Sequence, residues 1–239
     1  MDAEPQDNAL GEIVLASGSP RRIELLARLV PSFTSVASGA EESGSGLTPP
    51  FSLPPLVLAP PFPVAPEDDP RLWAWRKAME VARAGNASSS ERFVLGADTV
   101  VVGPGQVLNK PADREDARRM LTLLRGAYHY VVTGFVLVHW QGDTARTLHH
   151  EAVISTVFMR EFSAAELEEY VGTDEPYDKA GAYALQGLGG KLVDRVEGCM
   201  NNVIGLPACA VRSALREQGA DVRPYPFGGY CAHCPLMTS

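Results

Sequence analysis

Val14-Leu-Ala-Ser-Gly-Ser-Pro-Arg-Arg22 is the stretch of this sequence that says most about the fold. Its apolar start predicts a β-strand that ends at Ala16. The small residues Ser17, Gly18 and Ser19 predict a turn, and Pro20 suits the first position of a helix because its missing N–H is not needed there. The stretch therefore predicts a strand, a tight loop and a helix in succession.

The loop at residues 17–19 is a candidate anion site. Unpaired backbone N–H groups at a helix N-terminus attract negative charge, and Ser19 is a suitable N-cap. Arg21 and Arg22 are unfavourable at this end of a helix, by about 0.3–1 kcal/mol each, unless an anion is bound. Two interpretations stay open: a phosphate-binding loop, or two solvated arginines at a helix start.

The composition indicates a globular protein whose partner is a small molecule. Of the 239 residues, 45% are apolar and 21% are charged, and the net charge is −8. An acidic body argues against a general nucleic-acid binder. The acidic N-terminus lacks the apolar core of a signal peptide, and no stretch approaches the roughly 18 apolar residues of a membrane span. We therefore expect a cytoplasmic protein.

One large domain is expected between two short tails. Residues 12–219 carry the helix and strand patterns, and residues 1–11 and 220–239 are the tails. A proline-rich segment at about 43–68 excludes helix and central strand, so we expect a mobile, partly extended insertion there. Cys231-Ala-His-Cys234 lacks the nearby second pair that a zinc knuckle needs, which favours a reduced tail.

Helix and strand patterns alternate along the domain, which predicts an α/β fold. Apolar segments at 128–140 and 151–162, joined by a polar turn, predict a hairpin-like pair, so the sheet should be mixed. The other expected elements are a helix from Pro20, helices at 71–84, 113–124, 163–171 and 207–218, and strands at 32–37, 93–95, 100–102 and 191–196.

Asp98 is the second candidate functional residue. It stands between two apolar strand segments, where an unpaired carboxylate is costly to bury. It therefore needs a metal, a basic partner or a proton; the alternative is a carboxylate that caps a bend through backbone amides. Thr99 beside it suits either a hydrogen bond to a base or sugar, or a plain β-strand position.

Three lysines and a glycine-rich loop gain meaning only in combination. Singly, Lys110 and Lys179 are interpreted as solvated charges, and Lys77 falls on a different face of its expected helix from the apolar one. Residues 186–190 are interpreted as a flexible loop that could close over a ligand. Cleavage of a phosphoanhydride, however, needs cations on the phosphates, a carboxylate that binds Mg²⁺ or takes a proton from water, and a closed pocket. The lysines and the two arginines could supply the cations.

Several long motifs, in order, resemble those of the Maf family of nucleoside triphosphate pyrophosphatases over roughly residues 12–219. The opening motif is Leu15-Ala-Ser-Gly-Ser-Pro-Arg-Arg-Ile-Glu-Leu-Leu26. The later ones are Leu95-Gly-Ala-Asp-Thr-Val-Val-Val102, Asn109-Lys-Pro111, Asp178-Lys-Ala-Gly-Ala-Tyr-Ala-Leu-Gln-Gly-Leu-Gly189 and Val203-Ile-Gly-Leu-Pro207.

The resemblance implies a mixed, twisted sheet flanked by helices, with two lobes and a deep central cleft. It also implies hydrolysis of a nucleoside triphosphate between the α- and β-phosphates, with a divalent cation, Mg²⁺ or alternatively Mn²⁺. The catalytic residues implied are Asp98, Lys77, Lys110 and Glu42, with Asp98 and Glu42 on the metal side. The substrate-binding residues implied are Ser17, Gly18, Ser19, Arg21, Arg22, Thr99, Lys179 and Gln186.

The base preference follows from three of these residues. Arg21, Thr99 and Gln186 resemble the branch that hydrolyses dTTP and UTP, and an amide suits the O4 and N3–H edge of thymine or uracil. Open alternatives are a preference for 7-methyl-GTP, a catalytically silent nucleotide-binding regulator, and an interaction protein that uses the insertion and the cysteine tail. The expected partner is a nucleoside triphosphate, not nucleic acid or membrane, with a homodimer as an open alternative.

Overall fold

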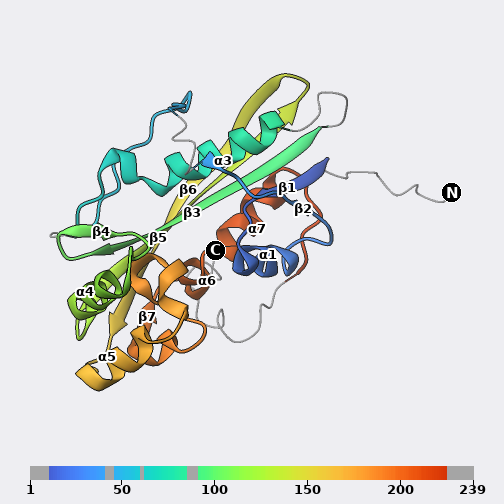
Figure 1. The fold of residues 1–239 in the computed structure, drawn as a ribbon. Coiled ribbons are helices and arrows are strands. Elements are labelled where there is room, and N and C mark those ends of the chain that lie inside the picture. The colour runs from blue at the N-terminus through green and yellow to red at the C-terminus, as the bar shows by residue number, and fades with distance from the viewer. Residues whose placement is uncertain (1–10, 41–45, 60–61, 85–90, 225–239) are drawn as a thin grey trace.

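A mixed seven-stranded sheet forms the centre of the protein (Figure 1), and the expected α/β class is confirmed. The computed structural model describes residues 11–40, 46–59, 62–84 and 91–224. The strand order is β2-β1-β3-β5-β6-β7, and β4 pairs with the far end of β3. β1 is parallel to β2 and β3, and the other pairs are antiparallel. The strands are β1 (Glu12–Ala16), β2 (Thr34–Ser35), β3 (Arg92–Gly103), β4 (Gln106–Leu108), β5 (Tyr128–Gln141), β6 (Thr144–Met159) and β7 (Val193–Glu197).

The helices begin largely where the sequence predicts. Asp113 caps α4 by accepting from the Asp116 N–H, and Ser163 and Glu166 form the capping box of α5. No helix in the described ranges is long and apolar enough to cross a bilayer. The α-helices are α1 (Pro20–Ala27), α3 (Pro70–Ala84), α4 (Arg114–Leu124), α5 (Ala164–Val171), α6 (Met200–Ile204) and α7 (Ala208–Glu217). The 3-10 helices are η1 (Pro66–Asp68), η2 (Glu175–Asp178), η3 (Ala180–Ala182) and η4 (Gly189–Leu192).

Several strand expectations were wrong in detail. Residues 93–95 and 100–102 belong to one continuous strand, because every residue from Arg92 to Val102 pairs with β5. Asp98 therefore lies in mid-strand and does not cap a bend. β6 begins at Thr144 and not at residue 151, and β2 covers two residues instead of six. The short α6 was not expected.

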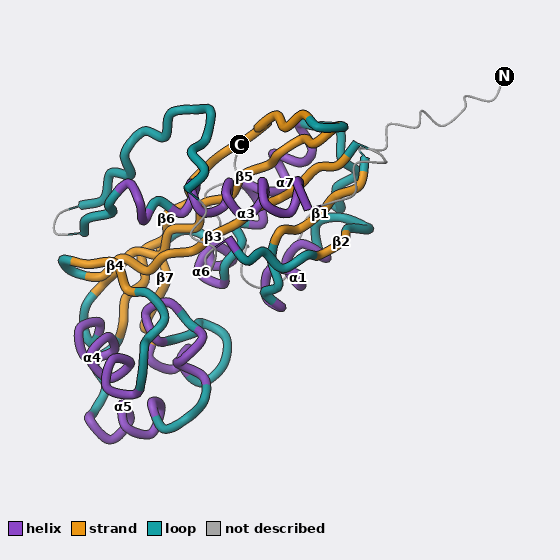
Figure 2. Tube along the Cα trace, turned by 45° about the horizontal axis from the view of Figure 1, so that its top comes forward, coloured by secondary structure: helices purple, strands orange, loops and turns teal. Residues whose placement is uncertain are grey.

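One face of the sheet carries two separate apolar cores. Ala97 of β3 packs in a core with α1 and α7, whereas Val101 packs in a second core with α4 and α5. Figures 1 and 2 show α4 and α5 at one end of the sheet and α1 towards the other. Thr99 lies between the two core positions on this face, since alternate residues of a strand point to the same side. The two cores form the two lobes.

α3 covers the opposite face and lies directly on the strands. A Cβ on Gly96 of β3 would lie 1.9 Å from the Ala74 carbonyl oxygen, and one on Gly134 of β5 would lie 2.3 Å from the Arg71 nitrogen. Only glycine leaves room for this contact between helix backbone and sheet. The two glycines thereby bring the side chains of α3 close to the middle of β3.

The described part of the proline-rich segment packs on the same face as α3. Phe62 is buried against Tyr130 of β5, and neighbouring apolar residues of the segment contact Val100, Val102 and Val132. Arg71 forms a buried ion pair with Asp69 and donates a hydrogen bond to the Pro54 carbonyl oxygen (2.6 Å). These contacts join the described part of the segment to the sheet and to α3.

Candidate active site

A pocket of about 630 Å³ opens where β1 ends beside the middle of β3. Pairing with β1 stops at Gly96 and pairing with β4 starts at Val101, so residues 97–100 have no strand partner on that side among the described residues. At this free edge side chains from both faces of β3 reach the pocket, including Asp98 and Thr99. The carboxyl ends of parallel strands are common ligand sites in α/β proteins.

The loop after β1 forms one wall of the pocket. Ser17 is buried, its hydroxyl accepts a hydrogen bond from the Ser19 N–H (3.2 Å), and its carbonyl oxygen accepts one from the Ser35 hydroxyl (2.7 Å). Ser19 is the N-cap residue of α1, as predicted, but its side chain makes no capping hydrogen bond. Gly18 and Ser19 line the pocket with Ser17.

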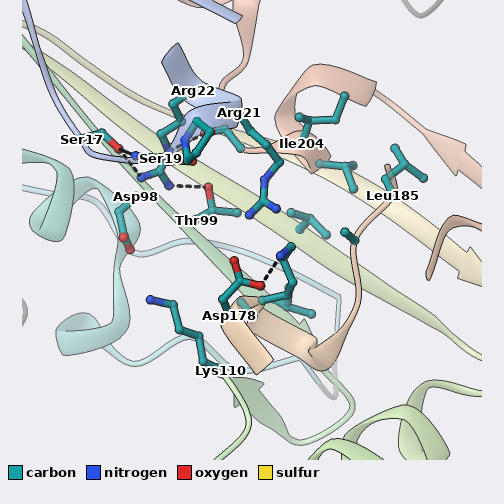
Figure 3. A pocket seen from close by; sticks show the side chains of 18 of the residues that line it. Ser17, Ser19, Arg21, Arg22, Asp98, Thr99, Lys110, Asp178, Leu185 and Ile204 are labelled. Atoms are coloured by element: carbon teal, nitrogen blue, oxygen red, sulfur yellow. Dashed lines mark hydrogen bonds and ion pairs between the residues drawn. The ribbon is translucent and has the colours of Figure 1, made fainter. Parts of the chain in front are cut away.

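Arg21 and Arg22 differ in their surroundings although they are adjacent. The Arg22 guanidinium donates to the Gly205 carbonyl oxygen (2.9 Å), to the Ser17 hydroxyl (3.4 Å) and to the Thr99 hydroxyl (3.0 Å). Arg21 extends into the pocket towards Asp178 (Figure 3). Arg22 therefore ties three elements together, whereas Arg21 presents its charge to the pocket.

A row of polar side chains crosses the sheet between the two cores. The Thr133 hydroxyl donates to the Asn202 carbonyl oxygen (3.0 Å), so it accepts the hydrogen of Thr99, 2.9 Å away. Asn202 of α6 also donates to the Ser155 hydroxyl (2.9 Å). The hydroxyl hydrogen of Thr99 is thus directed into the protein, and only an oxygen lone pair of Thr99 is left for a ligand.

Asp98 and Lys77 form the most buried ion pair that lines the pocket. The Lys77 Nζ atom lies 2.6 Å from Asp98 Oδ1, and the two side chains are 7% and 14% exposed. Lys77 reaches Asp98 because α3 lies directly on Gly96 and Gly134. The pair answers the question that the sequence left open: the basic partner of Asp98 is Lys77.

Lys110 and Lys179 enter the pocket from the opposite lobe. The turn that carries Lys110 is joined to η3 by a hydrogen bond from the Gly181 N–H to the Asn109 carbonyl oxygen (3.1 Å). Gly181 has a φ of 72°, and a Cβ there would lie 2.9 Å from Val101. Close packing of η3 on β3 thus places both lysines across from the loop after β1.

Asp178 is a second pocket carboxylate that sequence reasoning missed as a candidate. It forms an ion pair with Lys179, and Figure 3 shows it between Arg21 and Lys110. Burial opposes its ionisation, but the hydrogen bond from Lys179 and the charge of Arg21 prevail and lower the pKa of Asp178. The sequence did contain a signal for this residue, because Asp178 is the first residue of the Asp178–Gly189 motif and directly precedes Lys179.

Gln186 also lines the pocket, directly after Leu185 in the chain. Tyr183, Ala184 and Leu185 lie on the same segment, and Ile204 faces them from α6. Figure 3 shows Leu185 and Ile204 on the side of the pocket away from Asp98 and Lys110, so the pocket has an apolar end and a basic end. This suits a ligand with an anionic part and a flat, weakly polar part. Glu42 lies outside the described residues, so the structure neither places it in the pocket nor excludes it.

The carboxylates present fit Mg²⁺ that arrives with a phosphate ligand. The described residues contain no cluster of three metal-binding side chains. Mg²⁺, however, usually takes one or two carboxylates and completes its shell with substrate phosphates and water. Asp98 and Asp178, both in the pocket, are the described carboxylates that could serve.

The fold and the pocket define the class of protein. It is an α/β protein with two lobes on one mixed sheet and a basic pocket where the parallel strand β1 ends beside β3. The profile of the family described as "Maf-like protein" matches residues 12–218. The chain belongs to this family.

Similar proteins cover nearly the whole chain. A dTTP/UTP pyrophosphatase of Geotalea uraniireducens is 41% identical over 213 residues, which are 89% of this chain and 97% of that protein. One of Desulfitobacterium hafniense is 42% identical over 209 residues, 87% of this chain and 85% of that protein. One of Dictyoglomus thermophilum is 38% identical over 208 residues, 87% and 96% of the two chains.

Proposed function

We propose that this protein hydrolyses UTP and dTTP to the nucleoside monophosphate and pyrophosphate. The observation that carries the proposal is the Lys77–Asp98 pair at the free edge of β3, opposite a wall of basic residues. The names of the similar proteins support the same reaction. Removal of UTP and dTTP would give the protein a role in controlling the nucleotide pool.

The basic end of the pocket is suited to the triphosphate. Arg21, Lys110 and Lys179 come from both lobes, and the loop at residues 17–19 adds the N-terminal end of α1. Cations from two sides can hold the β- and γ-phosphates and stabilise the negative charge that develops on the leaving pyrophosphate. The α-phosphate then lies towards Asp98.

Asp98 is suited to accept the proton of the attacking water. The Lys77 ammonium holds one carboxylate oxygen at 2.6 Å and thereby fixes the direction of the other oxygen, which is left to face the water. Mg²⁺, or alternatively Mn²⁺, would screen the phosphate charge and polarise the phosphoryl oxygens when bound. The protein supplies the other functions: Asp98 accepts the proton of the attacking water, and Arg21, Lys110 and Lys179 bind the leaving pyrophosphate.

The apolar end of the pocket is suited to the base. The Gln186 amide can donate to O4 and accept from N3–H of uracil or thymine. The flanking Leu185 and Ile204 provide apolar contacts for the ring.

Pyrophosphate release from a panel of nucleoside triphosphates tests the proposal. We expect UTP and dTTP to give the highest kcat/KM, with release dependent on Mg²⁺ or Mn²⁺. A kcat/KM for 7-methyl-GTP above both pyrimidine nucleotides would overturn the base assignment. Tight UTP binding without any product would identify a silent nucleotide-binding regulator.

Arg21 and Arg22 should respond differently to the same substitution. Arg22→Lys is expected to lower the free energy of unfolding by about 1–2 kcal/mol, because lysine cannot bridge Gly205, Ser17 and Thr99 together. Arg21→Lys should leave stability nearly unchanged and raise the KM for UTP. Urea denaturation and initial rates measure both. The reverse pattern would contradict the division between a bridging and a substrate-binding arginine.

The remaining expectations belong to the same proposal. We infer a cytoplasmic protein, because nucleoside triphosphates are abundant there, and one that does not bind nucleic acid, in keeping with the net charge of −8. Light scattering distinguishes a monomer from the homodimer that the sequence left open.

A further inference from the structure

The loop that carries Gln186 is held by a single carboxylate outside the pocket lining. Glu175 of η2 accepts hydrogen bonds from the Leu188 N–H (2.9 Å) and the Gly189 N–H (2.8 Å), one on each carboxylate oxygen. Both donors follow Gln186 closely in the chain. The carboxylate therefore fixes the loop on the C-terminal side of Gln186.

Tyr170 of α5 extends this contact to the other side of Gln186. Its hydroxyl donates to Glu175 (3.1 Å) and lies beside the Ala184 backbone, since a Cβ on Gly189 would be 2.5 Å from the hydroxyl and 3.0 Å from the Ala184 nitrogen. Burial and the neighbouring Glu175 charge raise the pKa of Tyr170 well above its usual value, so the hydroxyl keeps its proton. Glu175 and Tyr170 together hold the chain before and after Gln186.

The loop of residues 186–190 lies directly against the side chains of Glu175 and Tyr170. Gly187 has a φ of 102°, and a Cβ there would lie 2.6 Å from the Glu175 carboxylate. A Cβ on Gly189 would lie 2.5 Å from the Tyr170 hydroxyl. The glycines thus permit direct contact of the loop backbone with Glu175 and Tyr170.

A fixed loop matters because an amide by itself discriminates poorly between pyrimidines. A rotated glutamine presents its donor and acceptor in exchanged positions and can pair with the edge of uracil or of cytosine. Discrimination therefore requires that the position and direction of the amide be fixed before the base arrives. Glu175 binds the backbone after Gln186, and Tyr170, hydrogen-bonded to Glu175, lies against the backbone on both sides of Gln186.

We propose that Glu175, supported by Tyr170, is a positioning residue that sets the preference for UTP over CTP by fixing the loop of Gln186. This inference rests on the proposed function. It assigns Glu175 no part in phosphate binding or in proton transfer, because Glu175 is absent from the pocket lining, whereas Asp98, Lys110 and Lys179 line the pocket.

The test is steady-state kinetics of Glu175→Gln with UTP and CTP. Glutamine keeps the shape but offers one acceptor to two N–H donors, so one hydrogen bond to a charged group is lost. We expect the KM for UTP to rise about tenfold and the UTP-over-CTP ratio of kcat/KM to fall about as much, with little change in kcat. Inhibition by inorganic tripolyphosphate, which has no base, should be unchanged.

Two further variants complete the design. Glu169→Gln alters an exposed carboxylate beside Tyr170 on α5 and should behave as the wild type. Tyr170→Phe removes only a hydroxyl, should shift the ratio in the same direction, and should add nothing to Glu175→Gln because the two residues act as a unit. If Glu175→Gln fails to fold, the UTP-over-CTP ratio of Tyr170→Phe alone tests the proposal.

The outcomes separate this inference from the proposed function. If the wild type releases no pyrophosphate from UTP, the proposed function is wrong. If the wild type is active but Glu175→Gln and Tyr170→Phe keep its UTP-over-CTP ratio, the positioning role is wrong. A parallel loss of tripolyphosphate binding would also overturn it, because the effect would then be a general one on the pocket.

Discussion

Replacing Asp98 by asparagine is expected to lower pyrophosphate release from UTP by about 100-fold or more. An amide of the same shape cannot take a proton from water, so the proposed attack loses its base. The Lys77 ammonium, 2.6 Å from Asp98 in the wild type, would also lose the charge that it faces. The loss should appear in kcat, because the triphosphate is held by Arg21, Lys110 and Lys179.

The measurement is single-turnover release of pyrophosphate, with binding of UTP followed by calorimetry. Asp194→Asn is the matched control, because Asp194 is an exposed carboxylate of β7 that faces Arg195. Thermal unfolding of each variant separates a loss of chemistry from a loss of fold. Turnover of folded Asp98→Asn at the wild-type rate would refute the role of Asp98 as the base.

The second large effect is expected from Gly96→Ala, a substitution that touches no charged group. Its Cβ would lie 1.9 Å from the Ala74 carbonyl oxygen, which belongs to the backbone of α3 and cannot rotate away. α3 must move from the sheet, and we expect the free energy of unfolding to fall by about 3 kcal/mol. The same movement withdraws Lys77 from Asp98, so activity should fall under conditions where the variant is still folded.

Urea denaturation and initial rates with UTP check this prediction. Gly46→Ala is the control, because a Cβ on Gly46 would meet nothing within 4 Å. Unchanged stability and activity of Gly96→Ala would show that α3 does not depend on this contact for its place on the sheet.

Local sequence patterns predicted the elements whose cause is local. The strand and helix around residues 14–22 follow from an apolar run, a small turn and Pro20, and the α5 capping box follows from Ser163 and Glu166. The interruption of β3 was predicted wrongly because Gly96 and Asp98 weaken a local strand pattern. Pairing with β5 along the whole strand outweighs that weakness, and no local window contains this information.

The sequence by itself determined which residues could act: a basic loop, an acid among valines, scattered lysines and a glutamine in a glycine-rich loop. It also determined the family, through motifs that occur in a fixed order. Only the tertiary structure decided the partners. Lys77 meets Asp98, Arg22 bridges three elements, and Glu175 holds the loop of Gln186. The physical reason is that these contacts join residues that are not neighbours in the chain. Lys77 meets Asp98 because the glycines of β3 and β5 allow α3 to lie on the sheet. The other contacts form because packing of the two apolar cores brings the two lobes together.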